Sequence, residues 1–205
     1  MLISRTFENM TIPLHIHDAI IDITLRLKNV PANWLIGGSC GLLLQGVETG
    51  KAPRDLDMYA DTEDASAIAA ALAYTAEDKP QYSETEIYRS ILSHYKYDDI
   101  VLELVGGFQI ISSGSIYTVE TGFLRSRLPV TVQLGDVSVP LMPLSHELIF
   151  NLLRGREDRY TAIAGAMRAD MEQHREALQT LVKRNKLSPQ LTLRIKELLG
   201  NGDWF

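Results

Sequence analysis

The sequence predicts an α+β fold in which helices flank a mixed β-sheet and a helical C-terminal segment follows. Two strand-like runs, residues 86–97 and 100–105, meet at Asp98 and Asp99, which is typical of a hairpin. A short apolar run at residues 34–36 ends at two glycines, and residues 54–60 form another strand-like run. From Leu144 onward, apolar residues recur at helical spacing.

The other elements follow from periodicity and end signals. We expect helices at residues 14–28, at 39–45 with Ser39 as N-cap, and at 63–74 with Thr62 as N-cap. We expect shorter strands at residues 108–120 and 130–139. In the tail we expect helices at residues 145–153, 159–184 and 188–199. We therefore divide the chain into an α/β core with an N-terminal helix, residues 1–143, and a helical segment, residues 144–205.

Composition is that of an ordinary globular protein. The 205 residues have a net charge of −6, which argues against a general nucleic-acid binder. No apolar run approaches the ~20 residues that span a membrane, and the first residues lack a signal-peptide pattern. The single cysteine, Cys40, excludes an internal disulfide and fits a reducing environment, so we expect a cytoplasmic protein without membrane partners.

The segment from Gly37 to Asp57 carries the strongest functional signal. Gly37, Gly38 and Ser39 follow a predicted buried strand and open a predicted helix, an arrangement that holds phosphates. Asp55 and Asp57 share one face of the next strand, roughly 7 Å apart, as ligands of a divalent metal would. Alone, the acidic pair is more often solvated and the glycine turn more often a helix cap. Together, and in this order, they indicate nucleotide chemistry.

This combination resembles the nucleotidyltransferase superfamily with the DNA polymerase β-like fold. The matching residues are Gly37-Gly38-Ser39 and Arg54-Asp55-Leu56-Asp57, and the resemblance extends over residues 34–105. Within the superfamily, the sequence is similar to minimal and toxin-like members. The resemblance implies a sheet-based nucleotidyltransferase core in which Asp55 and Asp57 hold two Mg²⁺ (or Mn²⁺) ions on a bound NTP. It also implies that Ser39 and the amides near Gly38 hold the β- and γ-phosphates.

The superfamily also uses a third carboxylate on a later strand, for which the sequence offers Asp99 and Glu103. Both share one strand face, opposite Ile100, Leu102 and Leu104. Asp99 beside Asp98 reads as turn chemistry, whereas Glu103 is a charge among apolar residues that a metal or base role would explain. We choose Glu103, while an outward position on an edge strand remains open for it.

The tail carries a weaker resemblance to toxin-like and small-substrate members. Those members have a Pro-x-x-Leu-Ile stretch, then a lysine, an arginine and a Lys-Asp pair. Here residues 143–149 match the first part, but Asn151 stands near the lysine position and Glu157-Asp158 near the pair. Arg154 or Arg156 could supply the missing charge for nucleotide binding, or both could lie on a solvated helix face.

Two functions remain open from the sequence. The first is an enzyme that transfers an NMP from an NTP to a hydroxyl or phosphate acceptor on a small molecule, a tRNA or a protein. The second is a catalytically inactive nucleotide-sensing or partner-binding module, such as one half of a toxin–antitoxin pair. The altered tail favours the module, and the intact Asp55 and Asp57 favour the enzyme. Neither the acceptor, nor the base, nor the oligomeric state follows from the sequence.

Overall fold

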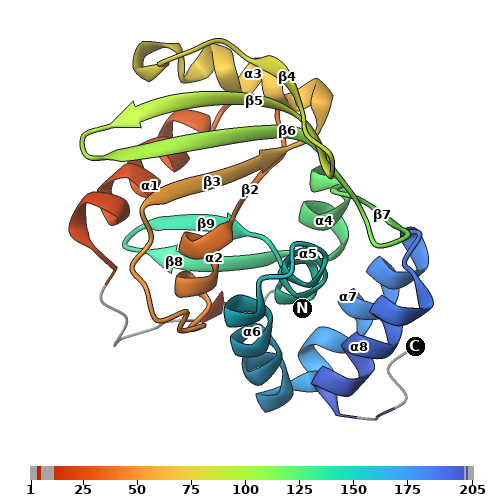
Figure 1. Ribbon diagram of the computed structural model, residues 1–205. Helices are drawn as coiled ribbons and strands as arrows, with labels where there is room; N and C mark the ends of the chain where they lie inside the picture. Colours follow the sequence, from red (N-terminus) through yellow and green to blue (C-terminus); the bar gives the residue numbers. More distant parts are fainter. Residues whose placement is uncertain (1–3, 6–11, 201, 203–205) are drawn as a thin grey trace.

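The computed structural model describes residues 4–5, 12–200 and 202 (Figure 1). One mixed β-sheet has the strand order β1-β8-β9-β2-β3-β6-β5-β4, and β7 pairs with the far end of β6. Its strands are β1 (Ser4–Arg5), β2 (Trp34–Gly37), β3 (Asp55–Ala60), β4 (Gln81–Glu84), β5 (Tyr88–Tyr97), β6 (Ile100–Ser112), β7 (Ser115–Thr118), β8 (Val130–Leu134) and β9 (Val137–Leu141).

Eight α-helices and one short 3₁₀ helix are described. They are α1 (Leu14–Leu27), α2 (Gly38–Leu44), α3 (Thr62–Ala71), the 3₁₀ helix η1 (Ala73–Thr75), α4 (Thr121–Arg127), α5 (Leu144–Leu153), α6 (Glu157–Ala169), α7 (Met171–Arg184) and α8 (Pro189–Leu199). The predicted α+β class, with a mixed sheet between helices and a helical C-terminal segment, is confirmed. Within the described residues, no helix is long and apolar enough to cross a membrane.

Five local expectations were wrong. The predicted helix 159–184 breaks into α6 and α7 at Asp170, whose backbone is not helical (φ −149°, ψ 67°). The predicted strand 130–139 is a hairpin that turns at Gly135, and the predicted strand 108–120 contains the β6–β7 turn at Gly114. The N-cap of α2 is Gly37, two residues before the predicted Ser39, and the N-cap of α3 is Asp61, one residue before the predicted Thr62.

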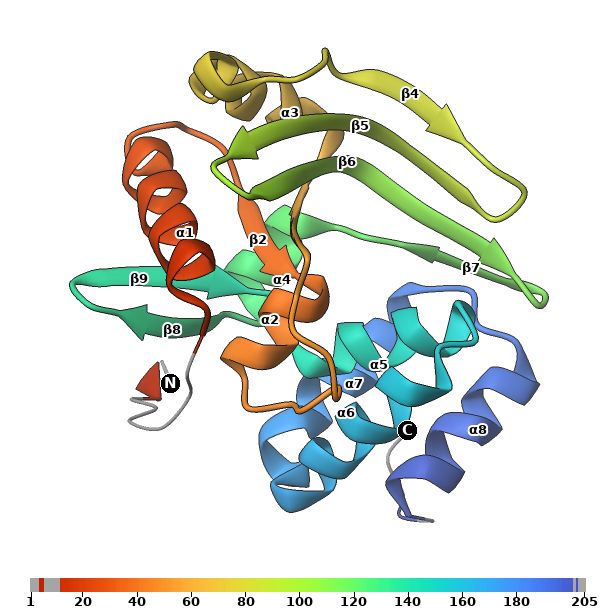
Figure 2. The ribbon, with the colours of Figure 1, turned by 60° about the vertical axis from the view of Figure 1, so that its left-hand side comes forward.

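The central strands separate two hydrophobic clusters, because their side chains alternate between the two faces. Leu56 and Met58 of β3 face the cluster that contains α1 and α3, whereas Tyr59 belongs to the cluster under α5, α6, α7 and α8. Figure 2 shows α1 on one side of β2 and β3, with the tail helices on the other. Asp55 and Asp57 therefore share the sheet face that looks toward the tail.

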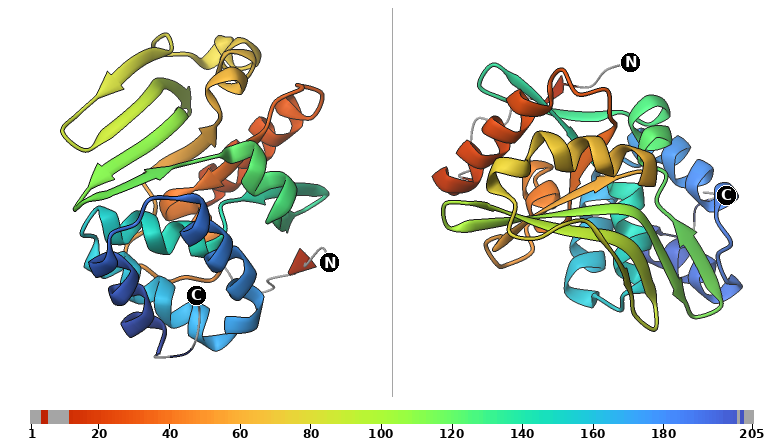
Figure 3. Two further views of the ribbon diagram at one scale, coloured as in Figure 1. Left: turned by 90° about the vertical axis from the view of Figure 1, so that its right-hand side faces the viewer. Right: turned by 90° about the horizontal axis from the view of Figure 1, so that it is seen from above.

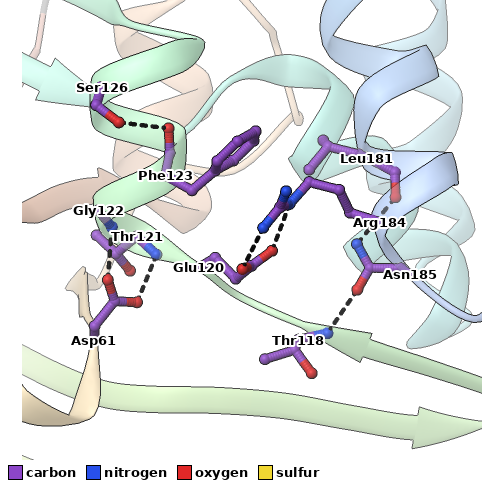
Figure 4. Close-up of polar contacts among 10 residues, drawn as sticks. All are labelled: Asp61, Thr118, Glu120, Thr121, Gly122, Phe123, Ser126, Leu181, Arg184 and Asn185. Atoms are coloured by element: carbon purple, nitrogen blue, oxygen red, sulfur yellow. Dashed lines mark hydrogen bonds and ion pairs between the residues drawn. The ribbon is translucent and has the colours of Figure 1, made fainter.

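The tail helices form one group against that face (Figure 3) and are joined to the sheet at several points. Arg184 of α7 forms a bidentate ion pair with Glu120, with N···O distances of 2.7 and 2.8 Å (Figure 4). The side-chain oxygen of Asn185 accepts a hydrogen bond from the Thr118 backbone amide. The same hydrophobic cluster includes residues from both sides of position 143. The division into two domains at residues 143 and 144 stays a prediction.

Candidate active site

The glycine turn connects β2 to α2 and packs directly on the second aspartate. Gly37 is paired with Asp57 in the antiparallel β2–β3 register. Gly38 has a positive φ of 59°, and a Cβ at this position would lie only 1.8 Å from Asp57 Oδ2. Glycine is therefore required twice here, for the left-handed backbone and for the close approach of the carboxylate.

The amide of Gly38 does not face an open phosphate site. It donates a hydrogen bond of 2.8 Å to Oε1 of Glu147, a buried residue of α5. Ser39, the second residue of α2, instead lines an open pocket beside Asp55. Of the two phosphate-binding groups that the resemblance implied at this turn, the pocket thus offers Ser39.

Three carboxylates line up on neighbouring strands. β3 and β6 run parallel, and their register places Asp57 directly beside Glu103 and Asp55 beside Val101. Directly paired residues of adjacent strands point to the same face, so Glu103 joins Asp55 and Asp57 on the tail-facing side. Asp99 lies in the turn before β6, beyond the segment of β6 that pairs with β3. The strand register therefore brings Glu103, and not Asp99, next to the aspartate pair.

Electrostatics at Asp57 reflect this crowding of negative charge. Burial, followed by the nearby charges of Asp55 and Glu103, raises the pKa of Asp57 to about 7, while Arg154 and Arg159 act in the opposite direction. Among the described residues, no three His, Cys, Asp or Glu side chains converge closely enough to form a ready-made metal cluster. Mg²⁺ seldom needs one, because it is commonly bound by one or two carboxylates together with substrate phosphates.

A cation-rich pocket opens beside the first aspartate. Ser39 and Asp55 line it from one side, and the α5–α6 corner from the other. Its charged side chains are Lys51, Arg54, Asp55, Arg156, Asp158 and Arg159. This excess of cations is suited to a polyanion such as a triphosphate.

The predicted tail cations differ in their surroundings. Arg156 lines the pocket but is also paired with Asp158 at 3.0 Å. Arg154 is not part of the pocket lining, and its guanidinium lies 5.0 Å from the Phe150 ring centroid and 5.8 Å from that of Tyr88. Asn151, near the family's lysine position, is fully buried. Its amide nitrogen bonds to the Glu147 backbone carbonyl and carboxylate, so it does not replace the missing lysine as a pocket cation.

Sequence reasoning missed three residues of this site. Lys51 comes from the loop between α2 and β3, where spacing alone gave no reason to expect a pocket residue. Arg159 was read only as the start of a helix, yet it lines the pocket three residues after Arg156. Glu147 offered one usable signal, a single acid inside a mostly apolar helix.

Comparison with protein families finds a match over part of the chain. The family model of aminoglycoside-2''-adenylyltransferase matches residues 19–104, a segment that contains the glycine turn, Asp55, Asp57 and Glu103. Comparison with curated protein sequences finds no relative.

Solved structures extend the likeness over most of the chain. A candidate nucleotidyltransferase from Thermotoga maritima is 25% identical, with a TM-score of 0.64 over 74% of this chain and 91% of that one. The antibiotic-resistance factor ANT(2'')-Ia is 10% identical, with a TM-score of 0.50 over 83% of this chain and 93% of that one, and supports the fold alone. The chain thus has a nucleotidyltransferase fold and belongs to the nucleotidyltransferase superfamily.

Proposed function

We propose that this protein transfers a nucleoside monophosphate from an NTP to an acceptor in a reaction that requires Mg²⁺. The observation that carries the proposal is the register of β3 and β6, which sets Glu103 beside Asp57 and on the same face as Asp55. The cation-lined pocket adjoins this face at Asp55 and Ser39. The carboxylates are suited to bind the metal ion of a metal-bound triphosphate, and the neighbouring cations are suited to bind its phosphates.

The residues present fit divalent metal. All three candidate ligands are carboxylates, the ligand type that Mg²⁺ prefers. Burial, and then the charges of Asp55 and Glu103, raise the pKa of Asp57, and a bound cation would offset both effects. Asp55, Asp57 and Glu103 would hold two Mg²⁺ ions. When bound, the metal supplies charge neutralisation on the triphosphate and on the attacking and leaving oxygens.

The protein's own groups act mainly by positioning and by charge. Ser39, Lys51, Arg54, Arg156 and Arg159 hold the triphosphate at the pocket, and Arg154 adds positive charge near Asp57. The acceptor oxygen then attacks the α-phosphorus, the bond from this phosphorus to the bridging oxygen breaks, and pyrophosphate leaves. Glu103 lies on the side of Asp57 away from β2 and takes the proton of the acceptor.

A small molecule with a free hydroxyl is the acceptor class that we favour. The matching family model describes an aminoglycoside adenylyltransferase, and ATP is accordingly the first nucleotide to test. Long RNA fits less well, since residues 1–143 carry 18 acidic against 10 basic side chains. The non-catalytic module would become the better reading if the pocket bound no nucleotide.

Thermal unfolding with each NTP tests the proposal without knowledge of the acceptor. A ligand at about 100 times its dissociation constant adds roughly 2.7 kcal/mol to the free energy of unfolding. For a chain of this size, the midpoint should rise by about 5–10 °C with at least one Mg²⁺–NTP pair. The rise should disappear without Mg²⁺ and in the Asp55→Asn/Asp57→Asn double variant. Absence of any shift in the wild type would contradict the proposal.

Glu103 and Asp99 can be separated by matched substitutions. Glu103→Gln should lower the rate of NMP transfer by about 100-fold or more, because it removes a metal ligand and the proton acceptor together. Asp99→Asn, in the exposed turn, should leave the rate within about threefold of wild type. Single-turnover transfer assays with a screened acceptor provide the measurement. A loss in Asp99→Asn equal to that in Glu103→Gln would move the third carboxylate to the turn.

A further inference from the structure

Glu147 joins the glycine turn to the tail helices. Its side chain is buried, and the residue is only 1% exposed. Oε1 accepts a hydrogen bond of 2.8 Å from the Gly38 backbone amide. Oε2 accepts one of 3.2 Å from the side-chain amide of Asn151, one helical turn later. One oxygen of the carboxylate thus binds the turn, and the other binds its own helix.

The turn is held between two carboxylates. On one side, Gly38 lies against Asp57, where a Cβ would be 1.8 Å from Oδ2. On the other side, a Cβ at Gly37 would lie 2.9 Å from Glu147 Oε1 and 2.9 Å from Tyr59 Cε2. The Gly38 backbone therefore has close neighbours on both sides, and its amide is bonded to Glu147.

The same helix leads to the opposite wall of the pocket. α5 ends at Leu153, and the corner that follows carries Arg156 and then Arg159 of α6, both in the pocket lining. Ser39, on the facing wall, directly follows the glycine that Glu147 holds. The Gly38–Glu147 bond therefore links the serine wall to the helix that leads to the arginine wall.

We propose that Glu147 is a positioning residue for triphosphate binding, which sets the glycine turn against the α5–α6 corner. The proposal rests on the proposed function, because it assigns the pocket to the triphosphate of an NTP. Glu147 itself does not touch the nucleotide in this arrangement. It acts through the Gly38 amide, and it is the reason that the same amide does not serve the phosphates directly.

Calorimetric binding of Mg²⁺–ATP to three variants tests this role. Glu147→Ala should weaken binding by roughly 10- to 100-fold, the usual range for a group that orients a binding residue. Glu147→Gln should remain within about threefold of wild type, because its amide oxygen can still accept the Gly38 N–H. Leu148→Ala, from the buried core of the same helix, serves as the control for lost stability and should also bind within about threefold.

Two results would overturn the proposal. One is wild-type affinity in Glu147→Ala, and the other is an equal loss of affinity in Leu148→Ala. AMP provides an internal comparison, since its binding should change much less than that of ATP if the effect passes through the triphosphate pocket.

Hydrogen exchange of the free protein separates this inference from the proposed function. Protection of the Gly38 amide should fall selectively in Glu147→Ala and persist in Glu147→Gln, whereas Leu148→Ala should change it only as much as it changes global stability. Unchanged protection in Glu147→Ala would show that Glu147 does not fix the turn. If the wild type binds no NTP while protection is lost selectively, the nucleotide function fails and Glu147 retains only the role of fixing the turn.

Discussion

Replacing Asp57 with Asn is expected to abolish nucleotidyl transfer and, at the same time, to stabilise the metal-free protein at pH 8. The first effect follows from the loss of a carboxylate that we assign to the metal. The second follows from burial and from the charges of Asp55 and Glu103, which raise the pKa of Asp57 to about 7. A neutral Asn removes that repulsion from the folded state.

The sign of the stability effect depends on pH. Below about pH 4, Asp57 is protonated in both the folded and the unfolded chain, so its shifted pKa costs no stability. As the pH rises toward 7, the unfolded chain releases the proton first, and the wild type becomes progressively less stable. The advantage of Asp57→Asn should therefore grow between about pH 4 and 7 and level off above. Allowing for partial exposure, we expect about 2 kcal/mol at pH 8.

Thermal melts from pH 4 to 8 measure this effect, and Mg²⁺–NTP should invert it. The nucleotide complex should stabilise the wild type and leave Asp57→Asn unchanged, so the order of the two midpoints reverses on ligand addition. Asp99→Asn is the matched control, because it makes the same chemical change in an exposed turn. A variant that transfers NMP at the wild-type rate, or that melts below the wild type at pH 8 without metal, would contradict the assignment of Asp57.

Alternation along a strand made the arrangement of the carboxylates largely predictable. Two residues of spacing put Asp55 and Asp57 on one face, and the same rule put Glu103 opposite Leu102 and Leu104. The partner of Glu103 could not be derived in this way. The pairing of Glu103 with Asp57 depends on the register of two strands 46 residues apart in sequence, which tertiary packing sets.

The basic wall of the pocket was only partly predictable, because it is built from segments far apart in sequence. Arg54 adjoins the aspartate pair and could be found locally, whereas Arg159 reaches the pocket only because α6 starts afresh after the corner at Gly155, which has a positive φ of 65°. Helical periodicity locates the break between residues 153 and 159 but does not give the direction in which the chain turns there. The break at Asp170 was missed because no Gly or Pro marks it.

Glu147 shows why a buried acid cannot be assigned from sequence alone. An isolated carboxylate in an apolar helix signals a special role, because burial of an unpaired charge is costly. Its partner is a backbone amide 109 residues earlier in the chain, and a backbone amide leaves no mark on the sequence. Burial raises the pKa of Glu147 to about 7, although the bond from Gly38 opposes this shift.

Gly38→Ala is expected to have the second large effect, and it tests the turn independently of any charge. The substitution introduces a Cβ on a left-handed backbone and directly against Asp57 Oδ2. The carboxylate must move, and misplacement of a reacting group by about 1 Å can reduce a rate about 100-fold. We therefore expect a loss of transfer of at least about 100-fold, together with loss of the Mg²⁺-dependent thermal shift.

Gly135→Ala is the matched control for backbone strain. Gly135 has a φ of 55°, close to the 59° of Gly38, but a Cβ there would meet no atom within 4 Å. It should therefore lose about 1 kcal/mol of stability and keep wild-type transfer. Melting and single-turnover assays of the two variants separate backbone strain from displacement of Asp57. Gly135→Ala introduces strain alone, whereas Gly38→Ala introduces strain and also displaces Asp57. Equal activity in both variants would mean that the turn does not hold Asp57 in place.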